Sequence, residues 1–592
     1  MVDELRDLLQ AAMDEQRRGE IAMAEAKYRT IVAARPEQWE VVYLFGTALL
    51  QLRRFGEAIE VFQRLAQVRP DLPDVHNNLG VAYQALGNCD QAARAYQAAV
   101  GLQGDFDRAY LNLGRLQEQQ GLLGEAEEWY RRAAQLKPTD TRYLLHFAGA
   151  LGKQHKWEEA EAVLREAVAT DQENLDLQIN LAYALIQREQ LDAAVEIYQH
   201  VLAQRPAYHE VHSNLAFVQE RQGNFDEALA AAQRAIELRP DYPDAFNNLG
   251  MILRSMHRLD EASRAFRRAL ELKPDFVLAE FNLGTTLLLA ENYSEGWTGY
   301  RHHGRLGDRV AFTTALPEWD GRPIPGKRLL VYADQGFGDA IQFSRFLPQC
   351  KTQSEARVVF RFQPELESLF ARLPGVDEFI PEGAAALTCD LHIPLASLPG
   401  LFGVTIESVG MGGPHLRSPE TIRTELAELL TRGSADTLRV GLVWQGNPRQ
   451  TRDVVRSCRL EKLVPLLKCD RTIFFSLQAD ELGRKQIAEL DVAGRLIDIG
   501  GSLRDFAETA AVLARLDLLV TVDTATAHLA GALGRPVWTM LCHTPDWRWH
   551  LKRSDSPWYP TMRLFRQPRW GDWDSVVVEI RDCLVTIDRL QR

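Results

Sequence analysis

Residues 243–276 read PDAFNNLGMILRSMHRLDEASRAFRRALELKPDF, and the pattern of this stretch recurs throughout the first half of the chain. Eight alanines stand 34 residues apart, at Ala24, Ala58, Ala92, Ala126, Ala160, Ala194, Ala228 and Ala262. A large apolar residue such as Phe266 usually follows four positions later, and proline, here Pro274, usually follows twelve positions later. Because proline stops a helix and the large residue lies one turn along the same face, this period predicts stacked helix-turn-helix units that form a solenoid.

The register resembles the tetratricopeptide repeat, whose period is 34 residues. The resemblance implies eight repeats and a curved surface that holds another molecule. A partial ninth unit is expected from about residue 276 to residue 305, where Gly296 replaces the alanine and Trp297 stands beside it. These replacements favour a terminal unit that docks on a different domain, so residues 1–305 are predicted to form the repeat domain.

Asparagine forms a further column in the same register, directly before the core residue of each first helix. Its members are Asn78, Asn112, Asn180, Asn214, Asn248 and Asn282, with His146 in the gap. Asparagine is a poor helix former and its amide both donates and accepts hydrogen bonds, so we expect the column to bind the backbone of an acceptor peptide. The O-GlcNAc transferase solenoid, which this part of the chain resembles, has the same ladder. The alternative is that the amides cap local backbone groups or stabilise contacts between repeats.

The composition excludes several classes of protein. At 592 residues the chain is too long for one core, and no apolar run approaches the roughly 20 residues of a membrane span. The acidic start MVDELRDLLQ does not resemble an export signal, so we expect a cytoplasmic protein. The net charge of −13 argues against a nucleic-acid partner, and the seven unpaired cysteines predict reduced thiols rather than a zinc site or a disulfide framework.

From about residue 310 the helical period gives way to short apolar runs rich in valine, leucine and isoleucine, which predict parallel strands joined by helices. Strands are expected at 328–332, 356–361, 390–394, 439–444, 472–476, 517–522 and 536–541. Two doubly wound lobes accommodate them, at residues 316–413 and 438–592, with the strand-free stretch 417–437 as the connection. Ligands of such sheets bind at the carboxyl ends of the strands, so the candidate site lies in the loops there.

The first of these loops lies in LLVYADQGFGDAIQFSRFL, residues 329–347. Gly336 and Gly338 permit a tight turn after the strand, and Asp339 is expected to open a helix, as its N-cap, as a chemical group, or as both. The order strand, glycine turn, aspartate and helix resembles the first loop of the bacterial heptosyltransferase family. The resemblance implies that Asp339 is the base that takes the proton of an acceptor hydroxyl, and that the glycines lie against the donor.

The second loop lies in LLVTVDTATAHLAGALGRPVW, residues 518–538. A strand leads to Asp523 and Thr524, where a helix of small residues begins, and the amides and dipole at such a helix start can hold a phosphate. The stretch resembles the DTxxxHLAxALG signature of the same glycosyltransferase group, whose loop grips the donor phosphate. The resemblance implies that Asp523, Thr524, Ala525 and His528 bind the donor. Close packing by the small residues and a core role for His528 are the alternatives.

Two more loops are expected at the same cleft. The loop QGNPRQTRDVVRS contains Gln445, Asn447, Arg449, Arg452 and Arg456, whose arginines would neutralise a diphosphate or a carboxylated sugar unless they are only solvated at the surface. Ser476 and Gln478 follow the next strand and are expected to meet a nucleotide base. The tryptophan-rich stretch 545–573 is expected to serve core and interlobe packing, with stacking on a base or sugar as the alternative.

Taken together, the chain resembles a bacterial protein O-glycosyltransferase, with a tetratricopeptide α-solenoid followed by an α/β GT-B module of two Rossmann-like lobes. Its domain order is that of O-GlcNAc transferase and of flagellin glycosyltransferases, whereas its loop motifs are closer to the heptosyltransferase-like family. The resemblance implies transfer of a sugar from a nucleotide-sugar donor, a CMP-nonulosonic acid or a UDP-sugar, to serine or threonine of an acceptor protein such as flagellin. No cofactor beyond the donor is expected. Because no aspartate pair of the DxD kind ends a strand, no metal is expected either. The alternatives are a non-catalytic adaptor with a degenerate GT-B domain and a glycosyltransferase of cell-surface polysaccharide.

Overall fold

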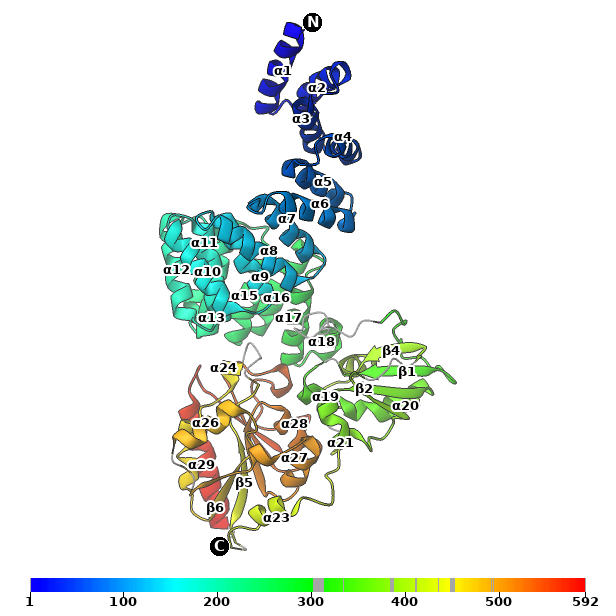
Figure 1. The fold of residues 1–592 in the computed structure, drawn as a ribbon. Coiled ribbons are helices and arrows are strands. Elements are labelled where there is room, and N and C mark those ends of the chain that lie inside the picture. The colour runs from blue at the N-terminus through cyan, green and yellow to red at the C-terminus, as the bar shows by residue number, and fades with distance from the viewer. Residues whose placement is uncertain are drawn as a thin grey trace. The chain divides into compact units, whose positions relative to one another are not determined.

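A computed structural model describes residues 2–301, 314–333, 335–383, 388–409, 413–434, 436–447, 453–490, 492 and 494–590 (Figure 1). The chain divides into two compact units, Met1–Val218 and Gln219–Arg592, and each is described by itself. The division falls within the repeats, so the last repeat helices belong to the same unit as the two lobes. The domain boundaries expected from the sequence stay predictions.

The helices of the first half follow the predicted 34-residue register. In the first unit they are α1 (Val2–Arg17), α2 (Ile21–Ala34), α3 (Trp39–Gln51), α4 (Phe55–Val68), α5 (Pro73–Ala85), α6 (Cys89–Leu102), α7 (Asp107–Gln119), α8 (Leu123–Leu136), α9 (Thr141–Lys153), α10 (Trp157–Thr170), α11 (Leu175–Gln187) and α12 (Leu191–Gln204). Helix α13 (His209–Gln222) spans the division, and α14 (Phe225–Leu238), α15 (Pro243–Ser255) and α16 (Leu259–Leu272) follow. The eight predicted helix pairs are confirmed.

The columns that define the register form the core of the repeats. All eight alanines are at most 1% exposed, which places every one of them in a helix interface. Small and large residues interlock between the two helices of a pair, since a Cβ atom on Gly80 would lie 2.5 Å from the ring of Tyr96. Proline stands two residues beyond most second helices, as Pro274 does after Leu272, the end of α16.

A ninth, shorter pair consists of α17 (Val277–Leu289) and α18 (Tyr293–Tyr300). Gly296 is buried where the register expects alanine, and a Cβ atom on it would lie 2.7 Å from the side chain of Leu288. The indole N–H of Trp297 donates a hydrogen bond of 2.8 Å to the carbonyl oxygen of Val404 in the following lobe. The expectation that the terminal unit docks on a different domain is therefore confirmed.

The N-terminal lobe contains a parallel sheet in the order β3-β2-β1-β4. Its strands are β1 (Arg328–Tyr332), β2 (Arg357–Phe362), β3 (Glu378–Pro381) and β4 (Leu391–Pro394). In the register, Leu330 of the central strand β1 pairs with Val359 of β2 and with His392 of β4. The helices are α19 (Phe337–Phe343), α20 (Leu347–Ser354), α21 (Glu367–Phe370) and α22 (Leu398–Leu401).

The C-terminal lobe contains a parallel sheet in the order β10-β9-β8-β5-β6-β7. Its strands are β5 (Leu438–Val443), β6 (Thr472–Ser476), β7 (Leu496–Asp498), β8 (Leu518–Val522), β9 (Val537–Leu541) and β10 (Met562–Arg566). The helices are α24 (Asp453–Arg456), α25 (Leu460–Leu463), α26 (Glu481–Glu489), α27 (Phe506–Leu513), α28 (Ala525–Ala532) and α29 (Trp573–Leu590). The chain therefore has the predicted architecture of a repeat solenoid followed by an α/β module.

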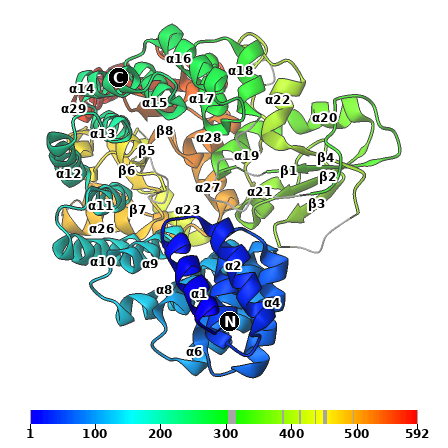
Figure 2. The same cartoon turned by 90° about the horizontal axis from the view of Figure 1, so that it is seen from above.

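Helices α19 and α28 pack against each other between the two sheets, as both views show (Figures 1 and 2). The connecting segment runs along this contact, because the N–H groups of His415 and Leu416 both donate to the carbonyl oxygen of Ala532 at the end of α28. The predicted strand-free connection at 417–437 holds helix α23 (Thr424–Leu430), and no strand is found among its described residues. The two candidate loops, which precede α19 and α28, are thereby brought to one place.

Candidate active site

The first candidate loop leads from β1 into α19, but the helix begins earlier than expected. Its N-cap is Gly336 and its first residue is Phe337, so Asp339 lies within the first turn and not at the N-cap position. The expectation that Asp339 opens the helix as its N-cap is therefore wrong. Neither Gly336 nor Gly338 has a positive φ, so the turn itself does not require glycine. At Gly338 the requirement is space, since a Cβ atom there would lie 2.8 Å from Cδ2 of His528.

Asp339 forms an ion pair with a residue that the sequence did not single out. Its Oδ1 atom accepts a hydrogen bond from Nη2 of Arg548, which lies in the short 3-10 helix η7 (Trp547–Trp549) of the C-terminal lobe. The carboxylate of the predicted base is thus held by a cation from the opposite lobe.

Arg548 is only 6% exposed, and every branch of its guanidinium has a partner. Nη1 donates to Oδ1 of Asp546 at 2.9 Å, Nη2 also donates to the hydroxyl of Tyr300 at 3.0 Å, and Nε donates to Oε1 of Gln342. Burial lowers the pKa of Arg548, but Tyr300, Asp546 and Asp339 together raise it well above its ordinary value. The buried side chain is therefore a permanent cation.

The second candidate loop has the predicted form of a strand, a polar turn and a helix start. Strand β8 ends at Val522, Thr524 is the N-cap of α28, and Gly534 closes the helix in the left-handed conformation with φ 67°. The hydroxyl of Thr524 lies 3.1 Å from that of Thr521. The first N–H groups of an α-helix have no carbonyl partner within the helix, so those of Ala525 and Thr526 are suited to an anion.

His528 is buried one turn into α28 and faces the first loop. Its Nδ1 atom lies 3.0 Å from the hydroxyl of Tyr559, and its ring packs against Trp549 with 5.2 Å between centroids. Burial, and then the charges of Arg548, Arg345 and Arg456, lower the pKa of His528 well below its ordinary value. The imidazole is therefore neutral at pH 7 and can take part in a hydrogen bond but cannot supply a charge.

Asp523 follows β8 directly and retains some exposure to solvent. Loss of contact with water, and then the carboxylate of Asp546, raise the pKa of Asp523, while the charges of Arg456 and Arg548 lower it. Carboxylates of Asp523 and Asp546 and cations of Arg456 and Arg548 thus influence one another at this sheet edge, which is the kind of environment in which perturbed groups mark functional sites.

The loops after β5 and β6 hold each other in place. The side-chain oxygen of Gln478 accepts hydrogen bonds from the N–H groups of Trp444 and Gln445, at 3.1 and 3.2 Å, and its amide nitrogen donates to the carbonyl oxygen of Gln445 at 3.0 Å. Ser476 is fully buried and accepts from the N–H of Gln478 at 3.3 Å. Both residues brace this edge, and their contact with a nucleotide base stays a prediction.

Arg456 is the arginine of the β5 loop whose position can be given. Its Nε atom donates to Oδ1 of Asp453 at 3.2 Å, and its side chain is about one quarter exposed, at 24%. Its charge acts on both Asp523 and His528. Asn447 is exposed on the same loop. Arg449 and Arg452 lie outside the described residues.

Part of the asparagine column makes contacts between neighbouring repeats. Asn78 donates to the hydroxyl of Tyr43 at 3.3 Å, Asn112 donates to Oδ1 of Asn77 at 2.9 Å, and the buried Asn282 donates to Oδ1 of Asn247 at 3.0 Å. These bonds are of the kind that the alternative interpretation anticipates.

Other members of the column are more accessible. Asn180 is exposed and donates only locally, to the carbonyl oxygen of Asp176 at 2.8 Å. Asn214 and Asn248 are half-buried. Peptide binding by the column stays a prediction, with Asn180 the most accessible candidate.

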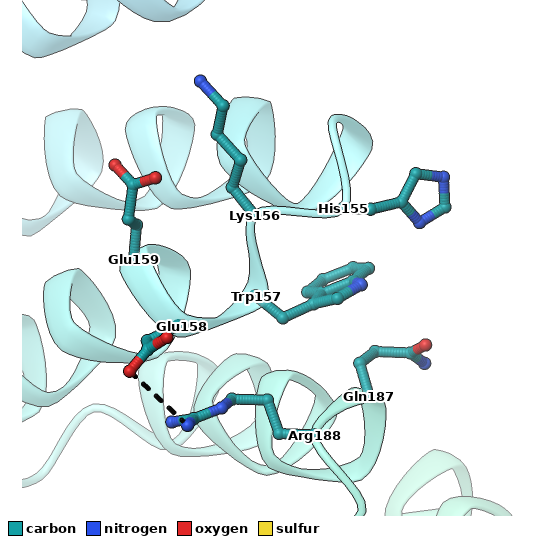
Figure 3. Close-up of a pocket in the computed structure, with 7 residues that line it drawn as sticks. All are labelled: His155, Lys156, Trp157, Glu158, Glu159, Gln187 and Arg188. Atoms are coloured by element: carbon teal, nitrogen blue, oxygen red, sulfur yellow. Dashed lines mark ion pairs between the residues drawn. The ribbon is translucent and has the colours of Figure 1, made fainter. Parts of the chain in front are cut away.

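An aromatic surface lies beside Asn180 in the first unit. Tyr183 is 52% exposed and follows Asn180 by three residues on α11, so the two share a helix face. Its ring meets the edge of Trp157 at 5.7 Å, and Trp157 lines a shallow hollow of about 460 Å³ together with His155, Lys156, Glu158, Glu159, Gln187 and Arg188. Figure 3 shows Trp157 and Gln187 beside this hollow, and Glu158 paired with Arg188.

The tryptophan-rich stretch has the packing role that the sequence predicts. Trp547, Trp549, Trp558 and Trp573 are all buried. The ring of Trp547 makes three of these contacts. It lies 5.3 Å from Trp297 and 5.4 Å from Tyr300 of the last repeat helix, and 5.8 Å from Trp558 of its own lobe, between ring centroids. This aromatic cluster surrounds Arg548.

Among the described residues, no group of three or more histidine, cysteine, aspartate or glutamate side chains could hold a metal ion. None of the helices in those ranges is long and apolar enough to cross a membrane.

The sequence failed to identify Arg548, Asp546, Tyr300 and Gln342 as part of this site. The one available signal for Arg548 was a single charge between two tryptophans in the stretch WRW. Such a charge in an aromatic segment must find a buried partner or reach solvent, but the sequence does not say which partner.

Comparison with known families finds matches in the repeat half of the chain and in the C-terminal lobe. Models of the tetratricopeptide repeat match residues 46–87, 77–141, 153–216 and 207–275. The model of glycosyltransferase family 9 (heptosyltransferase) matches residues 470–572, which include Asp523, His528 and Arg548. The β1–α19 loop with Asp339 lies outside the matched range.

Individual relatives are distant. Protein FlbA of Caulobacter vibrioides is 26% identical over 327 residues, and the aligned region covers 50% of this chain and 54% of that protein, so the chain spans about half the length of this curated relative. Two solved structures resemble part of the chain in fold. They are the C-terminal part of a TPR repeat-containing protein from Cytophaga hutchinsonii (16% identity, 41% of this chain, 99% of that chain, TM-score 0.35) and YrrB, a TPR protein with an unusual peptide-binding site (23%, 32%, 96%, 0.26). The chain is therefore similar to tetratricopeptide-repeat proteins over residues 46–141 and 153–275, and to glycosyltransferase family 9 over residues 470–572.

Proposed function

We propose that the protein transfers a sugar from a nucleotide-sugar donor to a serine or threonine hydroxyl of an acceptor polypeptide held by the repeats, without a metal ion. The observation that supports this most is the meeting of two loops from opposite lobes. Gly338, next to Asp339, approaches His528 of α28 so closely that a single Cβ atom would not fit between them. The predicted base and the predicted phosphate site therefore lie on two helices that pack against each other.

The donor is proposed to bind on the C-terminal lobe. Its phosphate would accept hydrogen bonds from the first N–H groups of α28, where the helix dipole favours negative charge. Neutral His528 adds a polar contact, and the cations Arg456 and Arg548 act on the same region. These groups suit a CMP-nonulosonic acid or a UDP-sugar, and no further cofactor is proposed.

The transfer is a single displacement at the anomeric carbon. The acceptor hydroxyl oxygen forms a bond to that carbon, and the bond from the carbon to the phosphate oxygen breaks, so the nucleotide leaves with the electron pair. The hydroxyl proton passes to the carboxylate of Asp339. The N–H groups of α28 stabilise the charge that grows on the leaving phosphate. A displacement of this kind inverts the anomeric configuration.

The acceptor is proposed to be a protein, with flagellin as a candidate, because a tetratricopeptide solenoid presents an extended concave surface suited to a polypeptide. Asn180 and Tyr183 share one face of α11, where an extended peptide would meet an amide and an aromatic ring. The reaction is proposed to take place in the cytoplasm.

The test uses the full chain with a panel of UDP-, CMP- and ADP-linked sugars and purified flagellin as the trial acceptor. Released nucleotide and the intact mass of the acceptor are both recorded. We expect a gain of one sugar mass with one donor, in the presence of a metal chelator, and a loss of about 10²- to 10⁴-fold in rate for Asp339→Asn. Asp320→Asn, an exposed aspartate in the same lobe, is the matched control.

Three results would contradict the proposal. Absence of turnover with every donor would favour a non-catalytic adaptor. Transfer to a cell-surface polysaccharide but not to protein would favour the other alternative. Unchanged turnover by Asp339→Asn would remove the role of this carboxylate as base.

A further inference from the structure

The last repeat helix, α18, contacts the segment Trp547–His550, which contains Arg548. Trp297 of α18 packs against Trp547 at 5.3 Å between ring centroids, and the hydroxyl of Tyr293 lies 3.3 Å from Nε2 of His550. His550 has φ 54°, a left-handed conformation that residues other than glycine rarely adopt, so the course of the segment is imposed by its contacts. Helix α18 supplies two of these contacts.

Tyr300, the last residue of α18, completes the connection. Its hydroxyl accepts a hydrogen bond of 3.0 Å from Nη2 of Arg548, the same nitrogen that donates to Oδ1 of Asp339. Tyr300 is 3% exposed, and burial raises the pKa of its phenol above its ordinary value, so it is a neutral partner. A single nitrogen atom therefore joins the end of the repeats to the predicted base.

The aromatic surroundings leave Arg548 one orientation. The centre of its guanidinium lies 4.5 Å from the ring centroid of Trp547 and 5.3 Å from that of Phe343. Nε and Nη1 are held by Gln342 and Asp546. A planar guanidinium with donors in fixed directions can bind Tyr300 and Asp339 together in this box, whereas an ammonium cannot make the same set of bonds.

We infer that Arg548 and Tyr300 are positioning residues for Asp339, so that the last repeat helix is a structural part of the active site. The inference rests on the proposed function, because it assigns these residues to the base of that reaction. Arg548 and Tyr300 touch no reacting atom in it. They fix the direction of the carboxylate and keep a cation beside it.

Charged and titratable groups surround this arrangement on every packed element. Asp546 precedes η7, Asp339 lies on α19, and Tyr300 ends α18. His528 lies on α28, Asp523 follows β8, and Tyr559, on which the charges of Arg548 and Asp339 act, precedes β10. The charge of Arg548 acts on both His528 and Asp523. A change at Arg548 therefore alters the field at the donor side as well, and the test must separate donor binding from turnover.

The experiment compares Tyr300→Phe, Arg548→Gln and Arg548→Lys in the full chain. For Tyr300→Phe we expect kcat to fall by about 10-fold, with the KM for the active donor within about twofold, because one hydrogen bond to a charged group is lost without a change of charge. Tyr96→Phe is the matched control. Tyr96 is also buried, and it donates to Oε1 of Gln84, 12 residues earlier in the same repeat. This repeat lies in the first unit, so the variant should keep full activity.

The two Arg548 variants separate charge from geometry. Arg548→Gln should move the acidic limb of the kcat/KM profile upward by about 1 to 3 pH units, because the cation beside the carboxylate is gone. Arg548→Lys should return the acidic limb close to its pH in the unchanged protein, because a cation is again present. Its kcat should stay about 10- to 100-fold below that of the unchanged protein, since an ammonium cannot hold the carboxylate in the same direction. A merely structural role would not produce this split.

Melting temperatures give a readout that does not depend on activity. Tyr300→Phe and Asp339→Asn are combined in a double-mutant cycle, and their effects should be non-additive, because both act on Nη2 of Arg548. Absence of turnover by the unchanged protein would refute the proposed function and with it the positioning role, while a non-additive cycle would still establish the contact. If the unchanged protein is active, additive melting temperatures, or Tyr300→Phe with unchanged kcat, would overturn the inference.

Discussion

Replacing Gly338 with alanine adds one methyl group at the contact between the two lobes. The Cβ atom would lie 2.8 Å from Cδ2 and 3.4 Å from Nε2 of His528, which is about 0.6 Å short of the ordinary contact distance for the first atom. Gly338 does not have a positive φ, so the backbone accepts alanine without strain. The whole effect of the substitution therefore arises from the space between α19 and α28.

The imidazole of His528 cannot move away without losing other contacts. Its Nδ1 atom lies 3.0 Å from the hydroxyl of Tyr559, its ring packs on Trp549, and all three residues are buried. Overpacking of a closed interface costs about 1–3 kcal/mol. We expect Gly338→Ala to destabilise the second unit by this amount and to reduce turnover, because the base and the phosphate site move apart.

Gly494→Ala is the control in the same unit. A Cβ atom at Gly494 has nothing within 4 Å and the residue does not have a positive φ, so the change should stay within about 0.5 kcal/mol. Thermal unfolding by calorimetry and nucleotide release are measured for both variants. The reasoning is refuted if Gly338→Ala matches the unchanged protein in both assays, or if Gly494→Ala is equally harmful.

Three further predictions concern the donor, pH and the repeats. Ala525→Asp puts a carboxylate in the first turn of α28, where it would repel a bound phosphate but suit the helix dipole. Calorimetric titration with UDP or CMP should therefore show an affinity at least about 10-fold lower, whereas the melting temperature should not fall. An unchanged affinity would place the phosphate elsewhere. Burial, and then the charge of Arg345, lower the pKa of His415 to about 3 in the folded protein. Below about pH 6.5 the unfolded chain therefore binds a proton at this histidine that the folded protein does not bind. The free energy of unfolding should be unaffected above pH 7 and should fall by about 2 kcal/mol between pH 7 and pH 5. Denaturant titrations at the two pH values should show this loss and a smaller one in His415→Gln. Asn180→Ala should weaken the binding of an acceptor peptide, measured by fluorescence anisotropy, without lowering the melting temperature. Asn282→Ala should instead lower the melting temperature, because its buried hydrogen bond to Asn247 is lost. The opposite ranking would contradict the division of the asparagine column into binding and packing members.

The repeat helices could be predicted almost residue by residue because each position is specified many times. The same small, large and helix-stopping residues return every 34 positions, so one irregular unit does not hide the period. All seven expected strands agree with the structure within one residue at each end, because most of them are buried, continuous apolar runs. They are β1, β2, β4, β5, β6, β8 and β9.

The elements that were missed lack such a run. β3 has only four residues, Glu378–Pro381, and all are half-buried, while β7 has only three. β10 lies inside the tryptophan-rich stretch, where aromatic density was interpreted as packing without a strand. Short length and edge position weaken the signal on which a sequence argument depends, although β4, which is also short and at an edge, was predicted.

The candidate site was predicted only where chemistry and chain order coincide. Asp339, Asp523 and His528 each follow a strand or begin a helix, so a local motif marks them. Arg548 follows no such motif. Its role depends on Tyr300, which is 248 residues away, and on Asp339, which is 209 residues away, and no local pattern encodes a pairing over that distance.

The departures of the ninth pair from the repeat pattern serve this distant pairing. A Cβ atom on Gly299 would lie 2.4 Å from the carbonyl oxygen of Glu280, and one on Gly284 would lie 2.6 Å from the backbone nitrogen of Tyr300. The backbones of α17 and α18 are therefore closer than the alanine and aromatic pair of a regular repeat allows. This close approach fixes Tyr300 at the end of a short helix, next to Arg548. A buried arginine costs desolvation energy that apolar residues of similar volume would not, so its value to the protein must lie in orientation rather than in stability. Gly284, Gly299 and Arg548 therefore act together. The absence of side chains at the two glycines lets α17 and α18 approach closely, and this approach places Tyr300 where it accepts the hydrogen bond of Arg548.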